Sequence, residues 1–113
     1  MSTGDAPWQG LSVTAYHQWR QEGRQHSLID VREDWEVAHA AITGHQHIPM
    51  AKIPANLETL RGMLRPLVLY CHAGIRSAQV ASFLCQNGLD QVYNLHGGIE
   101  AWSCKIDASI PRY

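Results

Sequence analysis

Short runs of apolar residues alternate along this chain with segments whose apolar residues recur at helical spacing. Each run is short enough for a strand, and the run at residues 67–70, Leu-Val-Leu-Tyr directly after Pro66, is the clearest of them. The pattern predicts five strands, at residues 11–13, 28–31, 47–49, 67–70 and 92–95.

The segments between these runs carry start and stop signals of helices. Thr14 suits an N-cap and Gly23 a helix end, and Pro54 suits the first position of a helix that stops at Gly62. Acidic residues after residue 32 favour a helical first turn. Helices are therefore predicted at residues 14–22, 54–61, 77–86 and 97–102, with a further short helix opening near residue 33.

Strands that alternate with helices predict an α/β domain with a mainly parallel sheet. The first ten residues are small and polar, so we expect a loosely ordered lead-in over residues 1–10 and one domain over residues 11–113. Ligands bind at the carboxyl ends of strands in such sheets. The residue that follows the clearest strand, Cys71, is therefore the first candidate for chemistry.

Composition and charge exclude several classes of function. The 113 residues carry a formal net charge of −1, which argues against binding nucleic acid or anionic membranes through bulk charge. No apolar run approaches the roughly 20 residues of a membrane helix, and no secretory signal is visible. Three cysteines do not form a disulfide framework, so a cytoplasmic location is expected. His45 and His47 alone do not complete a zinc site, and neither a metal nor a cofactor is predicted.

The turn at residues 71–76, Cys-His-Ala-Gly-Ile-Arg, combines several features that favour a thiolate. Its small residues let the backbone curl so that N–H groups point at one spot, and a helix begins just beyond it. The helix N-terminus adds positive potential, and Arg76 adds a permanent cation. These features predict a nucleophilic Cys71 that handles an anionic or sulfane-sulfur substrate, against the alternative of an inert buried thiol.

Four segments together resemble the rhodanese-like domain family. They are LIDVRE at residues 28–33, the glutamate, Ala-His and His-Ile-Pro within residues 36–49, VLYCHAGIRS at residues 68–77, and NLHGGIEAW at residues 94–102. The order and the combination make this resemblance specific, and it extends along most of the chain.

The resemblance implies a five-stranded, mainly parallel sheet with helices on both faces. It also implies a thiosulfate sulfurtransferase that works by a ping-pong mechanism, in which Cys71 takes sulfur from thiosulfate or a persulfide donor and passes it to cyanide, a thiol or a protein acceptor. Residues of the loop would bind the donor and the persulfide, and three others would support the loop. The donor-binding residues are His72, Ala73, Gly74, Ile75 and Arg76, and the supporting residues are Asp30, Arg32 and His39.

Two alternatives remain beside sulfur transfer. Cysteine phosphatases and arsenate reductases of related architecture have Cys-x5-Arg loops, whereas here Arg76 comes one residue sooner and Ser77 stands at the later position. The shorter loop suits a sulfur atom better than a phosphate group. A non-catalytic binding module is the other alternative, although its cysteine would usually be replaced. A monomer is expected.

Overall fold

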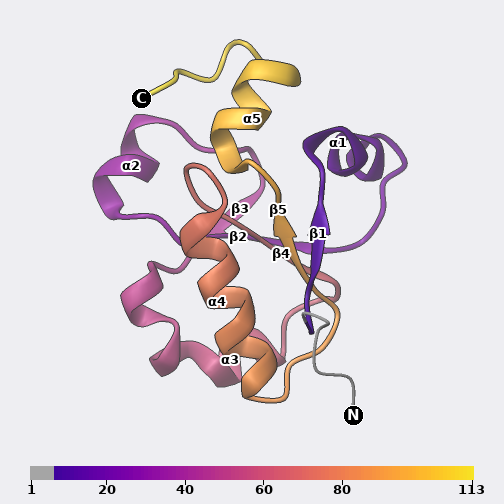
Figure 1. The fold of residues 1–113 in the computed structure, drawn as a ribbon, viewed down its shortest axis with the longest axis vertical. Coiled ribbons are helices and arrows are strands. Elements are labelled where there is room, and N and C mark those ends of the chain that lie inside the picture. Colours follow the sequence, from indigo (N-terminus) through magenta and orange to yellow (C-terminus); the bar gives the residue numbers. More distant parts are fainter. Residues whose placement is uncertain (1–6) are drawn as a thin grey trace.

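The computed structural model describes residues 7–113 and contains the expected five-stranded parallel sheet (Figure 1). The strands are β1 (Gln9–Leu11), β2 (Ser27–Asp30), β3 (His45–His47), β4 (Leu67–Tyr70) and β5 (Val92–Leu95). Their order across the sheet is β1-β5-β4-β2-β3, and every neighbouring pair is parallel. Strand β4 therefore lies at the centre, as expected for the run with four consecutive apolar residues.

Helices cover both faces of this sheet, which confirms the predicted fold class. The helices are α1 (Val13–Gln21), α2 (Asp34–His39), α3 (Leu57–Arg61), α4 (Ile75–Gln86) and α5 (Gly98–Lys105), and two short 3-10 turns lie at Met50–Lys52 and Pro54–Asn56. Helices α1 and α5 pack together on one face, while α3 and α4 contribute to the core on the other.

Alternate residues of β4 belong to the two different cores. Leu67 and Leu69 pack with residues of α3 and α4, whereas Val68 and Tyr70 pack with residues of α1 and α5. Side chains on a strand point alternately to opposite faces, so a central strand covered on both sides must be apolar throughout. This is why β4 could be recognised from its sequence.

The structure shifts the predicted boundaries of the two edge strands. Strand β1 begins at Gln9, which pairs with Tyr93, so the ordered sheet starts within the segment expected to be a lead-in. Residues 1–6 of that segment lie outside the described part of the chain. The helix that follows is capped by the Ser12 side chain, which accepts from the Ala15 N–H, and not by Thr14. Strand β3 ends at His47, two residues before the expected boundary.

The fold brings three segments to the carboxyl edge of the sheet. Strand β2 ends at Asp30, β4 ends directly before Cys71, and β5 ends shortly before Gly97 and Gly98. Because β2, β4 and β5 are neighbours, the residues after them lie close together (Figure 1). Within residues 7–113, none of the helices has the length and apolar character needed to cross a membrane.

Candidate active site

Cys71 directly follows the carboxyl end of β4, and its thiol is turned into the loop that leads to α4. The residue is only 1% exposed. Its Sγ accepts hydrogen bonds from the Gly74 N–H at 3.1 Å and the Ser77 N–H at 3.4 Å, and it lies 3.3 Å from the Ser77 Oγ. Gly74 is the N-cap of α4 and has φ +99°, a conformation that glycine adopts without strain. The loop therefore directs donors at the sulfur, from the positive end of a 12-residue helix.

Two residues that the sequence analysis did not select complete this arrangement. The Ser77 hydroxyl lies 2.5 Å from the Asn94 Oδ1, and the Asn94 Nδ2 donates to the Gly74 carbonyl at 3.1 Å. Asn94 lies on β5 and is 5% exposed. Its two hydrogen bonds hold both the Ser77 side chain and the backbone of the loop. An asparagine within an otherwise apolar buried strand was the available signal, because a buried amide needs partners.

The segment after β5 supports the other side of the loop. The Ile99 N–H donates to the Cys71 carbonyl and the Glu100 N–H to the His72 carbonyl, both at 3.0 Å. These two N–H groups belong to the first turn of α5 and have no partner within that helix. The loop is thus held between the N-terminal ends of two helices, α4 and α5.

The charge of Arg76 is paired with a carboxylate. Its two terminal nitrogens donate to the two carboxylate oxygens of Glu36 on α2, at 2.7 Å and 2.9 Å. This bidentate pair joins α4 to α2 beside the loop, and the hydrogen bonds that Arg76 donates to Glu36 hold the pKa of Arg76 above its ordinary value. The expectation that Arg76 orients an anionic donor stays a prediction, while the structure places this arginine in a fixed contact between two helices.

Glu36 is 3% exposed and its carboxylate is fully occupied. Besides Arg76, it accepts from the Tyr113 hydroxyl at 2.8 Å and from the Glu33 N–H at 3.0 Å. The hydrogen bonds from Arg76 are the main cause that lowers the pKa of Glu36 to about 2. Burial of the phenol raises the pKa of Tyr113 to about 12, so its hydroxyl stays protonated and donates.

This geometry predicts a loss of stability in acid that depends on Glu36. Because the folded-state pKa lies below the unfolded value of 4.5, the carboxylate stabilises the fold above that pH, and this contribution disappears as the pH falls towards 2. A shift of this size corresponds to about 3 kcal/mol. Urea unfolding followed from about pH 6 to about pH 3 should show a smaller pH dependence in Glu36→Gln than in the unchanged protein. Equal slopes would contradict this role.

Asp30 and Arg32 form a fully buried pair behind the loop. The Arg32 NH2 lies 2.6 Å from the Asp30 Oδ2, and its Nε donates to the same carboxylate. The remaining Arg32 donors reach the Ala40 carbonyl at 2.7 Å and the Tyr113 hydroxyl at 2.7 Å. These contacts tie the end of α2 and the C-terminal segment to the pair, and the supporting role of Asp30 and Arg32 stays a prediction.

The other predicted site residues lie at or near the opening of the loop. Ala73 is exposed, and Ile75 is 72% exposed at the start of α4. The His72 ring packs on Tyr113 with centroids 4.2 Å apart, and the exposed His39 also lies beside that tyrosine. The structure thus gathers the loop residues around Cys71, and it adds Tyr113, which the sequence analysis did not anticipate.

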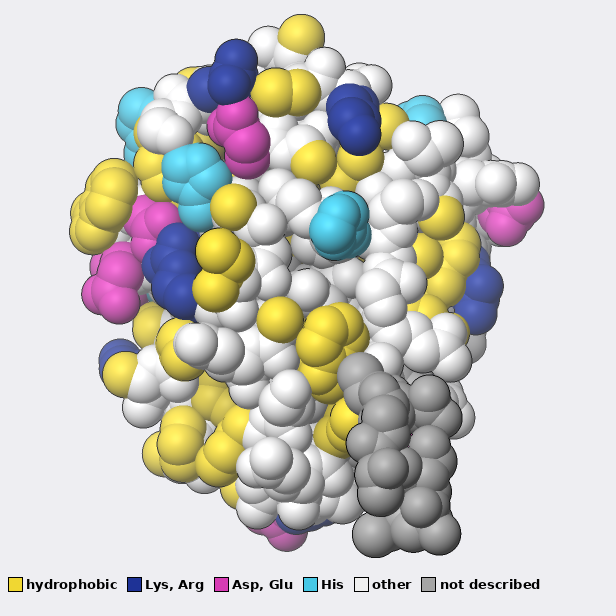
Figure 2. All heavy atoms as spheres, viewed as in Figure 1, with side chains coloured by type: hydrophobic (Ala, Val, Ile, Leu, Met, Phe, Trp, Pro, Cys, Tyr) yellow, Lys and Arg dark blue, Asp and Glu magenta, His cyan; other side chains and the backbone are white. Residues whose placement is uncertain are grey.

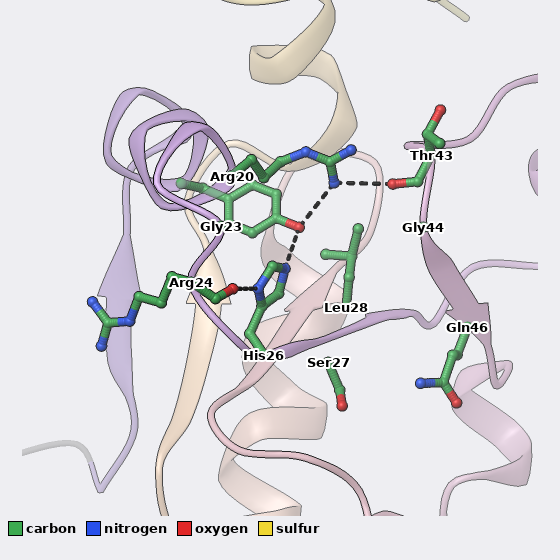
Figure 3. A pocket seen from close by; sticks show the side chains of 10 residues that line it. Arg20, Gly23, Arg24, His26, Ser27, Leu28, Thr43, Gly44 and Gln46 are labelled. Atoms are coloured by element: carbon green, nitrogen blue, oxygen red, sulfur yellow. Dashed lines mark hydrogen bonds between the residues drawn. The ribbon is translucent and has the colours of Figure 1, made fainter.

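A hollow lies away from Cys71, at the amino ends of β2 and β3 (Figure 3). Its volume is about 400 Å³. The hydroxyl of Tyr16 contacts the His26 Nε2 at 2.8 Å and accepts from Arg20, which also donates to the Thr43 carbonyl. These polar groups are used within the fold and include no nucleophilic cysteine, so we do not place the chemistry there. Among residues 7–113 no three metal-ligating side chains cluster.

Comparison with known proteins gives one consistent family. Residues 12–105 match the rhodanese-like domain. The chain is 39% identical over 89 residues to the rhodanese-like/PpiC domain-containing protein 12, chloroplastic, of Arabidopsis thaliana, which covers 76% of this chain but 30% of that protein. It is 38% identical over 76 residues to a protein of Allochromatium vinosum named sulfurtransferase, which covers 67% of this chain and 70% of that one.

A further relative and a solved structure agree with this result. The thiosulfate sulfurtransferase GlpE of Shewanella oneidensis is 33% identical over 81 residues, covering 72% of this chain and 79% of that protein. The crystal structure of a rhodanese-like domain protein from Staphylococcus aureus superposes with a TM-score of 0.78 at 29% identity, over 93% of this chain and 98% of that one. The chain thus spans less than a third of the plant protein and most of each bacterial one.

Proposed function

Because this chain belongs to the family of rhodanese-like domains, we propose that it is a sulfurtransferase that carries sulfane sulfur as a persulfide of Cys71. The observation that carries this proposal is the pair of backbone N–H groups, of Gly74 and Ser77, that point at the Cys71 Sγ from the end of α4. Such donors stabilise a thiolate, which is the nucleophilic form of cysteine. They would equally stabilise the negative charge of a persulfide.

The proposed reaction has two half-reactions. The Cys71 thiolate attacks the outer sulfur of thiosulfate, a new S–S bond forms, and the S–S bond of thiosulfate breaks with its electron pair leaving on sulfite. An acceptor, cyanide in an assay or a thiol or protein thiol in a cell, then attacks the outer sulfur of the persulfide. The Cys71 thiolate is regenerated, and with cyanide the product is thiocyanate. No oxidant, metal or cofactor enters this balance.

The burial of Cys71 fits a persulfide carrier. With 1% exposure, the thiol itself presents little surface to a bulky acceptor. An added sulfur lies roughly 2 Å beyond Sγ, so the transferable atom stands farther out than the cysteine that carries it. The relatives named sulfurtransferase and thiosulfate sulfurtransferase support this reaction class.

Arg76 also separates sulfur transfer from phosphate chemistry. A phosphatase loop uses its arginine to hold the oxygens of the phosphate group. Here both terminal nitrogens of Arg76 donate to Glu36, and the loop is one residue shorter than Cys-x5-Arg. We therefore favour sulfur over phosphate as the group transferred.

The test is the mass of the Cys71 peptide after thiosulfate treatment. Trypsin cleavage after Arg76 separates Cys71 from Cys85 and Cys104. We expect the peptide that contains Cys71 to gain the mass of one sulfur atom, and cyanide to remove that mass with release of thiocyanate. Added sulfur on the peptide with Cys85 and Cys104, or hydrolysis of a phosphate ester without any persulfide, would overturn the proposal.

A further inference from the structure

A hollow of about 470 Å³ opens beside the active-site loop, and part of its wall comes from the far end of the chain. Its lining consists of His72, Ala73, Glu100, Arg112 and Tyr113. After α5 the C-terminal segment runs back towards α2 (Figure 1), and its last two residues line the hollow. Basic, acidic and histidine side chains gather on this part of the surface (Figure 2).

The C-terminal segment is fastened on both sides of Arg112. On one side the Ser103 hydroxyl donates to the Ile110 carbonyl at 2.6 Å, and the Ile110 side chain packs against the core beneath α5. On the other side Tyr113 contacts Glu36, Arg32 and the ring of His72. The backbone of Arg112 is thus held at the edge of the hollow, while its side chain stays 65% exposed.

The arginines around the loop differ in how their charges are used. Arg32 is fully buried and paired with Asp30, and Arg76 is held by both oxygens of Glu36. Arg112 instead pairs with the half-buried Glu100. The Nε and the NH2 of Arg112 both donate to the Oε2 of Glu100, the Nε at 3.0 Å. An exposed pair of this kind contributes little net stability, so its carboxylate is readily exchanged for another anion.

We propose that Arg112 is the residue that binds the oxyanion end of the sulfur donor. The guanidinium exchanges Glu100 for the sulfonate oxygens of thiosulfate or of an organic thiosulfonate, which its forked donors match. The donor's outer sulfur then faces the loop at His72 and Ala73, the two residues that follow Cys71. This assignment rests on the proposed function and selects small oxyanion donors among the possible sulfur sources.

Steady-state kinetics with thiosulfate and cyanide test the assignment. Arg112→Gln should raise KM for thiosulfate about tenfold, as expected for the loss of a hydrogen bond between charged groups, while kcat stays close to that of the unchanged protein. Arg112→Lys should recover part of the loss, and Glu100→Gln should lower KM because it frees the guanidinium. Added salt should raise KM in the unchanged protein and much less in Arg112→Gln.

The matched control is Arg61→Gln. Arg61 also forms an exposed pair, with Glu58 in α3, but lies outside the hollow. It should leave KM unchanged. If Arg61→Gln and Arg112→Gln have equal effects, or if neither changes KM, the assignment to Arg112 is wrong.

A binding measurement separates this inference from the proposed reaction. In the Cys71→Ser variant, thiosulfate should shift the amide resonances of residues 72–74, and adding Arg112→Gln should weaken this binding about tenfold. If thiosulfate binding depends on Arg112 but the unchanged protein forms no thiocyanate, the proposed sulfur transfer from thiosulfate is wrong and the anion site at Arg112 is supported. Turnover together with binding that ignores Arg112, or an absence of binding, would overturn the inference.

Discussion

Replacing Cys71 by serine is expected to reduce thiocyanate formation from thiosulfate and cyanide to the rate without enzyme, a loss of at least about 1,000-fold. A hydroxyl cannot hold sulfane sulfur as a persulfide, so the first half-reaction has no carrier. The N–H groups of Gly74 and Ser77 would still point at the side chain, and serine accepts hydrogen bonds at least as well as a thiol. The variant should therefore fold, with a change in unfolding free energy within about 1 kcal/mol.

The two other cysteines provide the matched controls. Cys85 is partly buried on α4 and Cys104 is exposed on α5, and neither contacts the loop around Cys71. Cys85→Ser and Cys104→Ser should retain thiocyanate formation. A loss in Cys104→Ser, with activity surviving in Cys71→Ser, would move the sulfur carrier to α5 and reject the active site described above.

The central part of the fold could be predicted from sequence because burial leaves a plain signal there. Strands β2, β4 and β5 are covered on both faces, and β4 shows this as an unbroken apolar run. The edge strands β1 and β3 have three residues each, which is too few to show a period. Their positions depend on pairing with β5 and β2, so residues far away in the chain decide where they begin.

The active-site loop could be found for a different reason. Cys71, Gly74 and Arg76 are close in sequence, and a strand, a tight turn and a helix follow one another locally. The contacts of Arg76 could not be found in this way, because its partner Glu36 is 40 positions away. The resemblance to rhodanese-like domains implied that Arg76 binds the sulfur donor, and only the structure shows that its guanidinium is paired with a buried carboxylate on α2.

The C-terminal residues gave no sequence signal at all. Arg112 and Tyr113 follow a turn in a polar segment without helical spacing, and they reach the loop only because the chain returns past α2. Tyr113 alone contacts three segments through Arg32, Glu36 and His72. Contacts of this kind are set by the tertiary fold, so the anion site proposed at Arg112 required the structure.

Gly98→Ala is the second change for which we expect a large effect, with at least about 100-fold loss of activity, because displacement of a catalytic loop by about 1 Å has this consequence. A Cβ at Gly98 would lie 2.5 Å from the His72 carbonyl oxygen and closer still to that of Cys71. Both oxygens accept hydrogen bonds from the first turn of α5, so relieving the clash must move the loop and break these bonds. Together with the φ of +60°, this should lower the unfolding free energy by about 3 kcal/mol or more.

Gly23→Ala separates the effect of the positive φ from the effect of the steric clash. Gly23 has a similar φ of +69°, but a Cβ there would meet nothing within 4 Å. It should lose only about 1 kcal/mol from the left-handed conformation and should keep full sulfurtransferase activity. Thermal unfolding and thiocyanate formation measured on both variants decide the matter. If Gly98→Ala behaves like Gly23→Ala, the close approach of α5 to the loop does not position Cys71. The loop at residues 71–76 would then depend on α4 and Asn94 alone.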